Sequence, residues 1–191
     1  TGLPKAAVIS HGALLNFIDW ARDRFELTPD DRFTNVNPLY FDNSVFDFYA
    51  SIFNGACLCP TPSKLLQEPL RLANWVKENQ CTIWFSVPSL LVYLLTMHAL
   101  SQNDFPDVRK IIFGGEGFPK KKLGQLFELF GKRIELENVY GPTETTCICC
   151  AHTVTEDDLL DMSKLASIGR LAPNFESHII SEDENLRRGE L

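Results

Sequence analysis

The sequence predicts an α/β fold with a mostly parallel sheet, and three observations lead to this prediction. Short apolar stretches of strand length alternate with helical stretches of roughly ten residues or more, as in strands joined by crossover helices. The 191 residues are 45% hydrophobic and 23% charged, an ordinary globular composition that can bury a core. No internal repeat, low-complexity tract or linker interrupts the alternation. We therefore expect one α/β unit, built as a three-layer sandwich around the sheet.

Helices are expected where apolar residues recur with helical spacing. Ser10 can cap the first helix, which runs to about Ala21. Pro88 suits the first turn of a later helix. The other expected helices cover residues 44–54, 69–79, 88–100 and 119–130. The expected strands cover residues 32–37, 56–59, 81–85, 109–113, 133–139, 147–154 and 178–181.

Charge and hydropathy exclude two classes of partner. The 18 basic and 25 acidic residues give a net charge of −7, which argues against a general nucleic-acid binder but leaves room for a nucleotide pocket. The longest nearly apolar run, residues 90–100, is too short to span a bilayer, so we expect no membrane partner. No signal peptide is visible, which favours the cytoplasm.

The six cysteines are expected to be reduced thiols, the default for a chain of this size without secretory features. The cluster Cys147, Cys149 and Cys150 could suggest zinc, but its spacing lacks the usual ligand pairs. Packing within a strand is the simpler interpretation. The four histidines are expected to be structural or surface residues, and no Ser-His-Asp arrangement is apparent.

Residues of unusual chemistry follow four of the predicted strands. They occupy residues 37–42, 86–89, 114–117 and 140–144. In an open parallel sheet, ligands bind outside the carboxyl ends of the strands, so we expect these four stretches to converge on one ligand site. Glycine and proline could simply form turns there. That alternative explains less well why Tyr140, Thr143 and Glu144 occur together.

Each of these residues has a functional and a structural interpretation. Gly114 and Gly115 would let the backbone approach a ligand closely. Tyr140 could present a flat face to a purine or be a core aromatic residue. Thr143 could bind phosphate oxygens, and Glu144 could hold Mg²⁺ or occupy the first turn of a helix.

Asp42 follows Phe41 and is expected to be partly buried, so its carboxylate needs a partner. The partner could be a ligand ammonium group, or Asp42 could cap the helix that starts near Ser44. Residues 1–5 (TGLPK) resemble the end of a phosphate loop, although a lysine beside a Gly-Pro turn is usually exposed to solvent.

Taken together, these stretches resemble the adenylate-forming superfamily of acyl- and aminoacyl-AMP ligases. Residues 138–144 (NVYGPTE) are similar to its most specific signature, and residues 1–5 to the second half of its phosphate loop. Residues 41–44 (FDNS) resemble the element that marks its amino-acid-activating branch. Residues 16–20, 41–49 and 164–169 resemble D-alanine–carrier protein ligases, with the adenylation domains of nonribosomal peptide synthetases nearly as similar.

The resemblance implies an AMP-forming reaction that uses ATP and Mg²⁺. An amino-acid carboxylate would attack the α-phosphate, and a phosphopantetheine thiol on a carrier protein would then take the acyl group. Catalytic roles would fall to Lys5, Thr143 and Glu144, with Glu144 as the metal ligand. The nucleotide would be bound by Thr1, Gly2, Lys5, Gly115, Glu116, Asn138, Val139, Tyr140, Gly141, Pro142 and Thr143.

The same resemblance implies the amino-acid pocket. Asp42 would bind the substrate ammonium group. The side-chain pocket would be lined by Asn43, Phe46, Phe85, Ile112, Gly114, Val139, Cys147 and Ile148. D-Alanine ligases typically carry cysteine at the position of Gly114, so we expect the glycine here to admit a larger substrate.

The resemblance also implies that these 191 residues are one subdomain of a longer enzyme, truncated at both ends. The family's ribose-binding aspartate and catalytic lysine would lie beyond Leu191. We therefore expect residues 1–191 alone to be inactive in ATP–pyrophosphate exchange. Two alternatives stay open: an acyl-CoA or aryl-acid ligase, which would not need Asp42, and a noncatalytic nucleotide-binding module.

Overall fold

The structure is a computed structural model that describes residues 6–163 and 165–178. Its seven-stranded sheet has the order β2-β1-β3-β4-β5-β6-β7. The strands are β1 (Arg32–Asn35), β2 (Cys57–Pro60), β3 (Ile83–Ser86), β4 (Lys110–Gly114), β5 (Glu135–Tyr140), β6 (Cys150–Thr153) and β7 (Arg170–Leu171). The helices are α1 (His11–Phe25), α2 (Asn43–Val45), α3 (Ser51–Phe53), α4 (Pro69–Glu78), α5 (Pro88–Thr96) and α6 (Lys120–Phe130).

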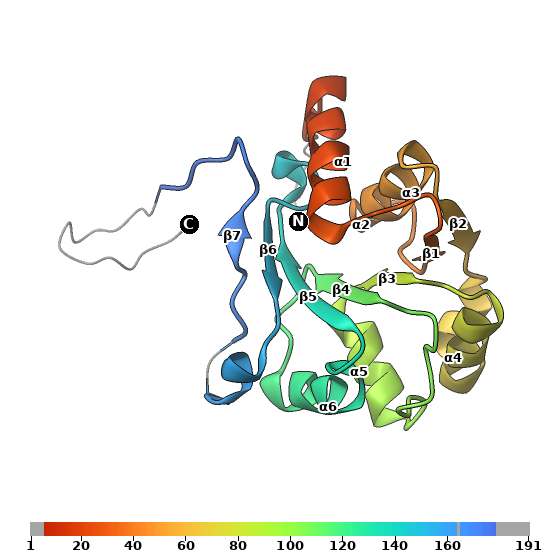
Figure 1. The fold of residues 1–191 in the computed structure, drawn as a ribbon. Coiled ribbons are helices and arrows are strands. Elements are labelled where there is room, and N and C mark those ends of the chain that lie inside the picture. The colour runs from red at the N-terminus through yellow and green to blue at the C-terminus, as the bar shows by residue number, and fades with distance from the viewer. Residues whose placement is uncertain (1–5, 164, 179–191) are drawn as a thin grey trace.

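Helices cover both faces of the sheet. Helices α1, α2 and α3 lie on one face, and α4, α5 and α6 lie on the other (Figure 1). Neighbouring strands are parallel throughout the part of the sheet formed by β2, β1, β3, β4 and β5. The β5–β6 and β6–β7 pairs are antiparallel. The predicted three-layer α/β architecture with a mostly parallel sheet is therefore confirmed.

Most elements lie within a few residues of their predicted positions. Ser10 caps α1 as expected, because its Oγ accepts a hydrogen bond from the Ala13 amide at 3.1 Å. The helix expected through residue 100 ends at Thr96. There His98 turns left-handed (φ 52°) and the Ala99 amide bonds to the Leu94 carbonyl at 2.9 Å, which closes the helix.

The last strands differ most from expectation. Strand β6 is antiparallel because only residues 141–149 connect it to β5, and a parallel return needs a crossover of a dozen or more residues. The short strand β7 was not predicted. The strand expected at 178–181 lies outside the described residues except for His178, which is not in a strand.

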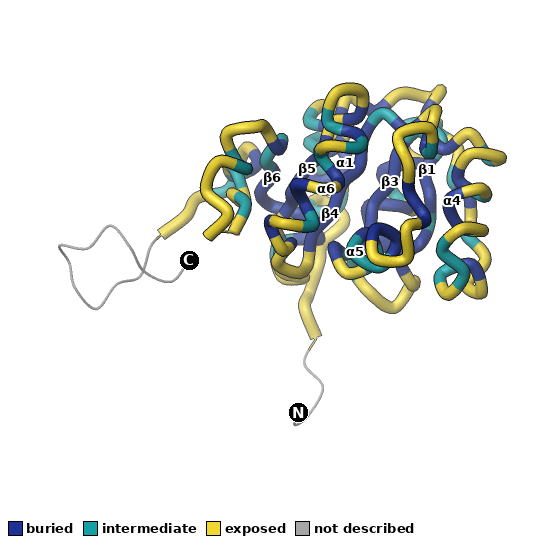
Figure 2. Tube along the Cα trace, turned by 90° about the horizontal axis from the view of Figure 1, so that it is seen from below, coloured by how far each residue is buried: buried dark blue, intermediate teal, exposed yellow. Residues whose placement is uncertain are grey.

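A hydrophobic core lies on each side of the sheet. The core under α4, α5 and α6 contains Trp84, which stacks on Phe105 at a ring distance of 5.3 Å. The core under α1 is centred on Phe46, whose ring packs edge-on against Phe25 at 5.4 Å and Phe85 at 5.2 Å. Figure 2 shows the buried strands between the partly exposed outer helices.

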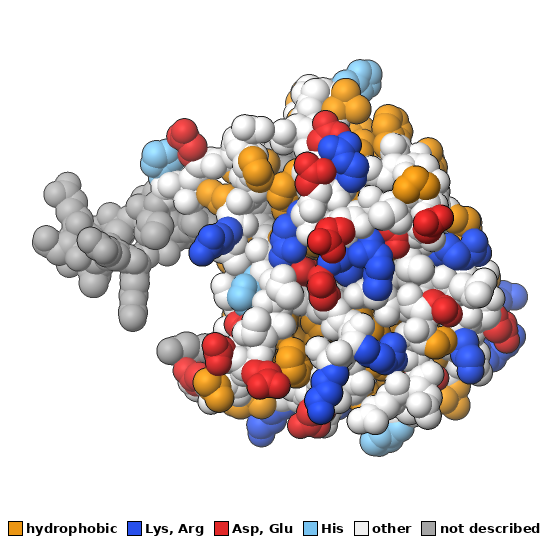
Figure 3. All heavy atoms as spheres, in the orientation of Figure 1, with side chains coloured by type: hydrophobic (Ala, Val, Ile, Leu, Met, Phe, Trp, Pro, Cys, Tyr) orange, Lys and Arg blue, Asp and Glu red, His pale blue; other side chains and the backbone are white. Residues whose placement is uncertain are grey.

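The surface carries charge of both signs. Acidic and basic side chains are interspersed on the face drawn in Figure 3, without a wide field of one sign there. None of the helices in residues 6–163 and 165–178 is both long and apolar enough to cross a membrane.

At the amino-terminal ends of the strands, the buried carboxylate of Asp31 pairs with the partly buried guanidinium of Arg109. Asp31 accepts two hydrogen bonds from the Arg109 guanidinium, at 2.8 and 2.7 Å, and one from the Thr82 hydroxyl at 2.7 Å. Arg109 also donates to the carbonyls of Phe25 and Glu26, at the end of α1. The pair therefore joins α1 to the starts of β1, β3 and β4.

The hydrogen bonds to the Asp31 carboxylate lower its pKa. Burial would raise the pKa of this carboxyl, but the hydrogen bonds from Arg109, Thr82 and the Thr28 amide outweigh that effect and lower the pKa below its ordinary 3.8. A lowered pKa in the folded state stabilises the fold above pH 3.8, and this contribution disappears as the pH falls through the folded-state pKa.

We predict that Asp31→Asn lowers the free energy of unfolding by about 2 kcal/mol or more near pH 6, because it leaves the Arg109 guanidinium partly buried without a charge partner. The difference from wild type should shrink near pH 3. Urea unfolding at the two pH values measures both effects, with the exposed neighbour substitution Asp30→Asn as the control. A loss no larger than that of the control, or a loss independent of pH, would contradict this role.

Candidate functional site

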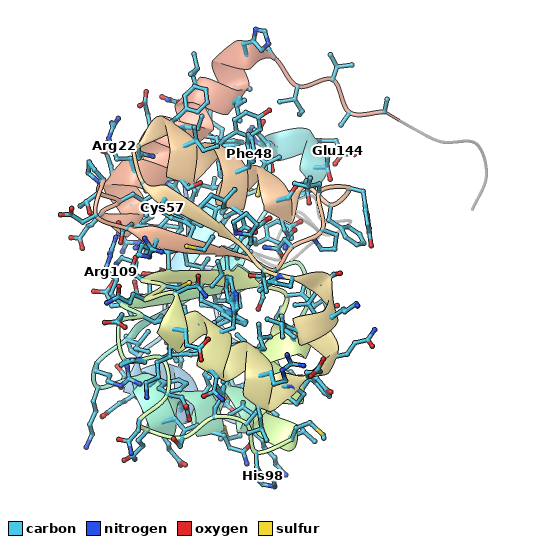
Figure 4. The ribbon with its side chains drawn as sticks, turned by 90° about the vertical axis from the view of Figure 1, so that its right-hand side faces the viewer. Arg22, Phe48, Cys57, His98, Arg109 and Glu144 are labelled. Carbon is cyan, nitrogen blue, oxygen red and sulfur yellow. The ribbon has the colours of Figure 1, made fainter. Side chains whose placement is uncertain are left out.

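Four loops meet at the carboxyl-terminal edge of the sheet. Strands β1, β3, β4 and β5 are consecutive neighbours and all parallel, so the loops that follow them lie along one edge. Figure 4 shows Glu144, which follows β5, at the end of the molecule opposite to Arg109, which precedes β4. The four stretches converge on one face, as predicted, because each of them contributes residues to the lining of one cavity.

A first cavity of about 440 Å³ opens at the end of β5. Tyr140 lines it and keeps 39% of its surface exposed, so this ring is not a core aromatic residue. The other lining residues are Gly115, Glu116, Gly117, Phe118, Asn138, Val139, Gly141, Pro142, Leu165, Ala166 and Ile168. The cavity therefore combines an exposed aromatic face, glycine backbone and apolar walls, which suits a planar heteroaromatic base.

One wall of this cavity comes from a segment that the sequence does not predict to be part of the site. Leu165, Ala166 and Ile168 come from the segment before β7, and the Asn138 side chain anchors that segment by donating its Nδ2 to the Ser167 carbonyl at 2.8 Å. Because this segment has no regular structure, hydrophobic periodicity could not have revealed its position. Asn138 therefore shapes the cavity as well as lining it.

A second cavity of about 570 Å³ adjoins the first. Both are lined by Gly115, Glu116, Gly141 and Pro142, so these four residues form a shared wall. Glu116 is held in place by the Ser89 amide, which donates to its Oε2 at 3.2 Å. A ligand with two chemically different ends could therefore lie across this wall with one end in each cavity.

Asp42 and Thr143 meet at the rim of the second cavity. The Thr143 hydroxyl donates to Asp42 Oδ2 at 2.6 Å, across 101 residues of sequence. Asp42 makes no side-chain hydrogen bond to the start of α2, so the capping interpretation is wrong. Both residues also line a third cavity of about 290 Å³ beside α1. A partly exposed carboxylate at this position can bind a cationic ligand group.

The carboxylate of Glu144 is available to a metal. It is exposed in the 3₁₀ turn Thr143–Thr145, and within the described ranges no hydrogen bond or ion pair engages it. No cluster of three or more acidic, cysteine or histidine groups suited to a metal occurs in residues 6–163 and 165–178. A single carboxylate fits Mg²⁺ when phosphate oxygens and water supply its other ligands.

The predicted side-chain pocket is only partly open. Asn43 and Val139 line the larger cavities, and Cys147 lines the third. Burial raises the pKa of the Cys147 thiol well above its ordinary value, and the nearby carboxylates of Asp42 and Asp47 raise it further. Four members, Phe46, Phe85, Ile112 and Ile148, are at most 2% exposed and belong to the core under α1. Their role as pocket lining stays a prediction.

Gly114 does not leave open space for a substrate. A Cβ built on it would lie 2.5 Å from the Val139 carbonyl oxygen and 2.7 Å from Val139 Cγ2. The space freed by glycine is therefore filled by β5, which overturns the steric reason for expecting a larger substrate. The remaining predicted residues, Thr1, Gly2 and Lys5, lie outside the described residues.

We predict that Gly114→Ala destabilises the fold by about 1–3 kcal/mol, because its Cβ would force β4 and β5 apart. The matched control is Gly12→Ala in α1, where the nearest atom to the new Cβ is Ser10 Oγ at 3.8 Å. Thermal unfolding of both variants checks the comparison. Equal stability of the two variants would show that β4 and β5 tolerate a side chain at this position.

Comparison with known proteins agrees with this geometry. The model of the AMP-binding enzyme family matches residues 1–191. An L-proline–[L-prolyl-carrier protein] ligase of Streptomyces coelicolor is 40% identical over 83% of this chain and 30% of its own length. A D-alanine–D-alanyl carrier protein ligase of Bacillus anthracis is 31% identical over 96% of this chain and 36% of its own length.

Among solved structures, the Vibrio cholerae adenylation domain AlmE, in complex with glycyl-adenosine-5′-phosphate, is similar with a TM-score of 0.75. It is 28% identical, and the match covers 85% of this chain and 30% of that one. The chain thus spans about a third of the length of the relatives it matches. Because the family match covers the full length of the chain, the chain belongs to the AMP-binding enzyme family.

Proposed function

We propose that the protein containing this chain is an AMP-forming amino acid–carrier protein ligase. It activates an amino acid with ATP to an aminoacyl-AMP and then transfers the aminoacyl group to a phosphopantetheine thiol of a carrier protein. The observation that carries this proposal is the pair of adjoining cavities, with an exposed tyrosine face in one and the Asp42 carboxylate at the rim of the other.

The arrangement suits a ligand with an adenine at one end and an ammonium group at the other. Adenine would pack on Tyr140, and the ammonium group would pair with Asp42. The amino-acid carboxylate and the α-phosphate would then meet at the wall shared by the two cavities. The backbone at Gly115 can approach the phosphate there because this residue has no Cβ.

The chemistry requires positioning and charge neutralisation more than a protein nucleophile. A carboxylate oxygen of the amino acid attacks the α-phosphorus, and pyrophosphate leaves. The thiol sulfur then attacks the acyl carbon, and AMP leaves. The hydroxyl of Thr143 can donate to a phosphate oxygen, and Glu144 would hold Mg²⁺, which neutralises phosphate charge when bound.

A small amino acid is the substrate class that we propose. The named substrates of the relatives, L-proline and D-alanine, and the glycyl group bound by AlmE are all small. The same comparisons support ATP as the nucleotide and a carrier protein as the acyl acceptor.

We predict that the full-length protein catalyses ATP–pyrophosphate exchange with a small amino acid, and that Asp42→Asn lowers kcat/KM for that amino acid at least about 30-fold. The loss is expected because the variant removes the charge that pairs with the ammonium group. The assay compares L-proline, D-alanine, L-alanine and glycine, with Asp30→Asn as the control.

The Asp42 result separates this proposal from its competitors. If carboxylic acids without an amino group support exchange and Asp42→Asn has no effect, the protein is an acyl- or aryl-acid ligase. If no carboxylic acid supports exchange while ATP still binds, the noncatalytic nucleotide-binding interpretation replaces the proposal.

A further inference from the structure

A second carboxyl group lies close to the candidate site in sequence and has no part in the reaction proposed above. Asp47 follows Asp42 by five residues and lies in the π-helical turn Phe46–Ala50, between α2 and α3. Its side chain is completely buried, with 0% exposure. A buried carboxyl group must be held by specific partners, and these partners connect it to the site.

The partners of Asp47 are Asn35, the last residue of β1, and Asn37, in the loop that follows β1 (the Asn37 loop). Its Oδ2 accepts hydrogen bonds from Asn37 Nδ2 at 3.0 Å and from Asn35 Nδ2 at 3.2 Å. Asn37 Nδ2 also donates to the Phe85 carbonyl in β3 at 3.0 Å. Asp47 thus joins the helical segment after Asp42 to the carboxyl ends of two strands. Asn37 itself lines the second cavity, together with Asp42.

The π-helical turn that carries Asp47 is stabilised by a side chain of the next helix, Ser51. The Ser51 hydroxyl contacts the carbonyl oxygens of Asp47 and Phe48, at 2.5 and 3.0 Å, so it provides a donor where the wider turn disrupts the regular helical hydrogen bonds. Phe46 and Asp47 are both fully buried, although they are consecutive. Wider turns of this kind occur frequently at functional sites.

The contacts favour the neutral form of Asp47. The two side chains that donate to the Asp47 carboxyl group are neutral amides, and no neighbouring charge contributes to its ionisation. Within the described ranges, Oδ1 has no hydrogen-bond partner. An uncompensated buried charge is unfavourable. Burial raises the pKa of Asp47 to about 8, although the bonds from Asn37 and Asn35 oppose this.

Few titratable groups of the described residues lie near this segment, and one of them, Tyr49, is part of the turn. Asp42 precedes it, and the buried thiol of Cys147 faces both carboxyl groups from the segment before β6. Helix α1 and strand β1 contribute Phe17, Phe25 and Phe33 to the packing around Phe46. With Asp47 neutral, Asp42 is the carboxylate of this segment that can attract an ammonium group.

We propose that Asp47 is a positioning residue of the amino-acid site. It fastens the segment that carries Asp42 to the Asn37 loop, so that the carboxylate of Asp42 faces the second cavity. The predicted effect on the KM for the amino acid rests on the proposed function, whereas the predicted effect on the pH dependence of stability does not.

The kinetic test compares three variants of the full-length protein, with L-proline and D-alanine as the amino acids. Asp47→Leu removes the acceptor of the two amide bonds at similar volume, so KM for the amino acid should rise about tenfold or more while KM for ATP changes less than about twofold. Asp47→Asn keeps a neutral acceptor oxygen and should restore the wild-type KM within about twofold to threefold. Phe48→Leu, in the same turn but with a 40% exposed side chain, is the control and should leave both KM values unchanged.

A second readout does not depend on activity. A carboxyl group whose pKa is raised by folding stabilises the folded state below its unfolded pKa, and this contribution is lost as pH rises through the folded pKa. Wild type should therefore lose unfolding free energy relative to Asp47→Asn between pH 3.8 and about 8. Urea unfolding across this range measures the difference.

The two readouts separate failure of this inference from failure of the proposed function. Parallel pH profiles for wild type and Asp47→Asn would overturn the assignment of a protonated Asp47, whatever the protein catalyses. Unchanged amino-acid KM in Asp47→Leu, equal increases in both KM values, or failure of Asp47→Asn to rescue KM would overturn the positioning role. Absence of exchange with any amino acid in wild type would refute the proposed function and, with it, the positioning role, and would leave the pH result standing.

Discussion

Parallel hydrogen bonding between β1, β3, β4 and β5 is the constraint on which the site depends. It brings four loops that are far apart in sequence to one edge of the sheet, where their polar residues can act on one ligand. The ion pair between Asp31 and Arg109 secures the opposite edge, where β1, β3 and β4 begin. The candidate site thus lies at the carboxyl-terminal ends of the strands, and the ion pair that joins the strands lies at their amino-terminal ends. The loops of the site therefore need not hold the sheet together.

Two glycines, Gly141 and Gly169, allow close backbone approaches beside the site. A Cβ on Gly141 would lie 2.3 Å from the Cys147 carbonyl oxygen, so the loop after β5 lies directly against the segment that leads to β6. A Cβ on Gly169 would lie 1.9 Å from the Ala151 carbonyl oxygen, which places the segment after Ile168 equally close to β6. Glycine at 141 and 169 therefore allows these segments to pack closely. At Gly115, by contrast, the side that lacks a Cβ faces the cavities.

The sequence predicts the parts of this structure that local patterns encode. Strand and helix periodicity places most elements to within a few residues, and the stretch 138–144 predicts where a nucleotide would bind. Contacts between distant residues have no such pattern. The bond between Asp42 and Thr143 spans 101 residues, and the two-residue strand β7 has too little periodicity to detect. Phe46 and Phe85 show why apolar residues are hard to assign, since a core and an apolar pocket favour the same side chains.

The central claim is that one ligand lies across both cavities, with its adenine on Tyr140 and its ammonium group on Asp42. A crystal structure of the full-length protein with a non-hydrolysable prolyl- or D-alanyl-adenylate analogue tests it most directly. We expect the ammonium nitrogen within about 3 Å of an Asp42 oxygen and the adenine ring against Tyr140. An analogue bound with its ammonium group away from Asp42, or with its adenine outside the cavity lined by Tyr140, would contradict the claim.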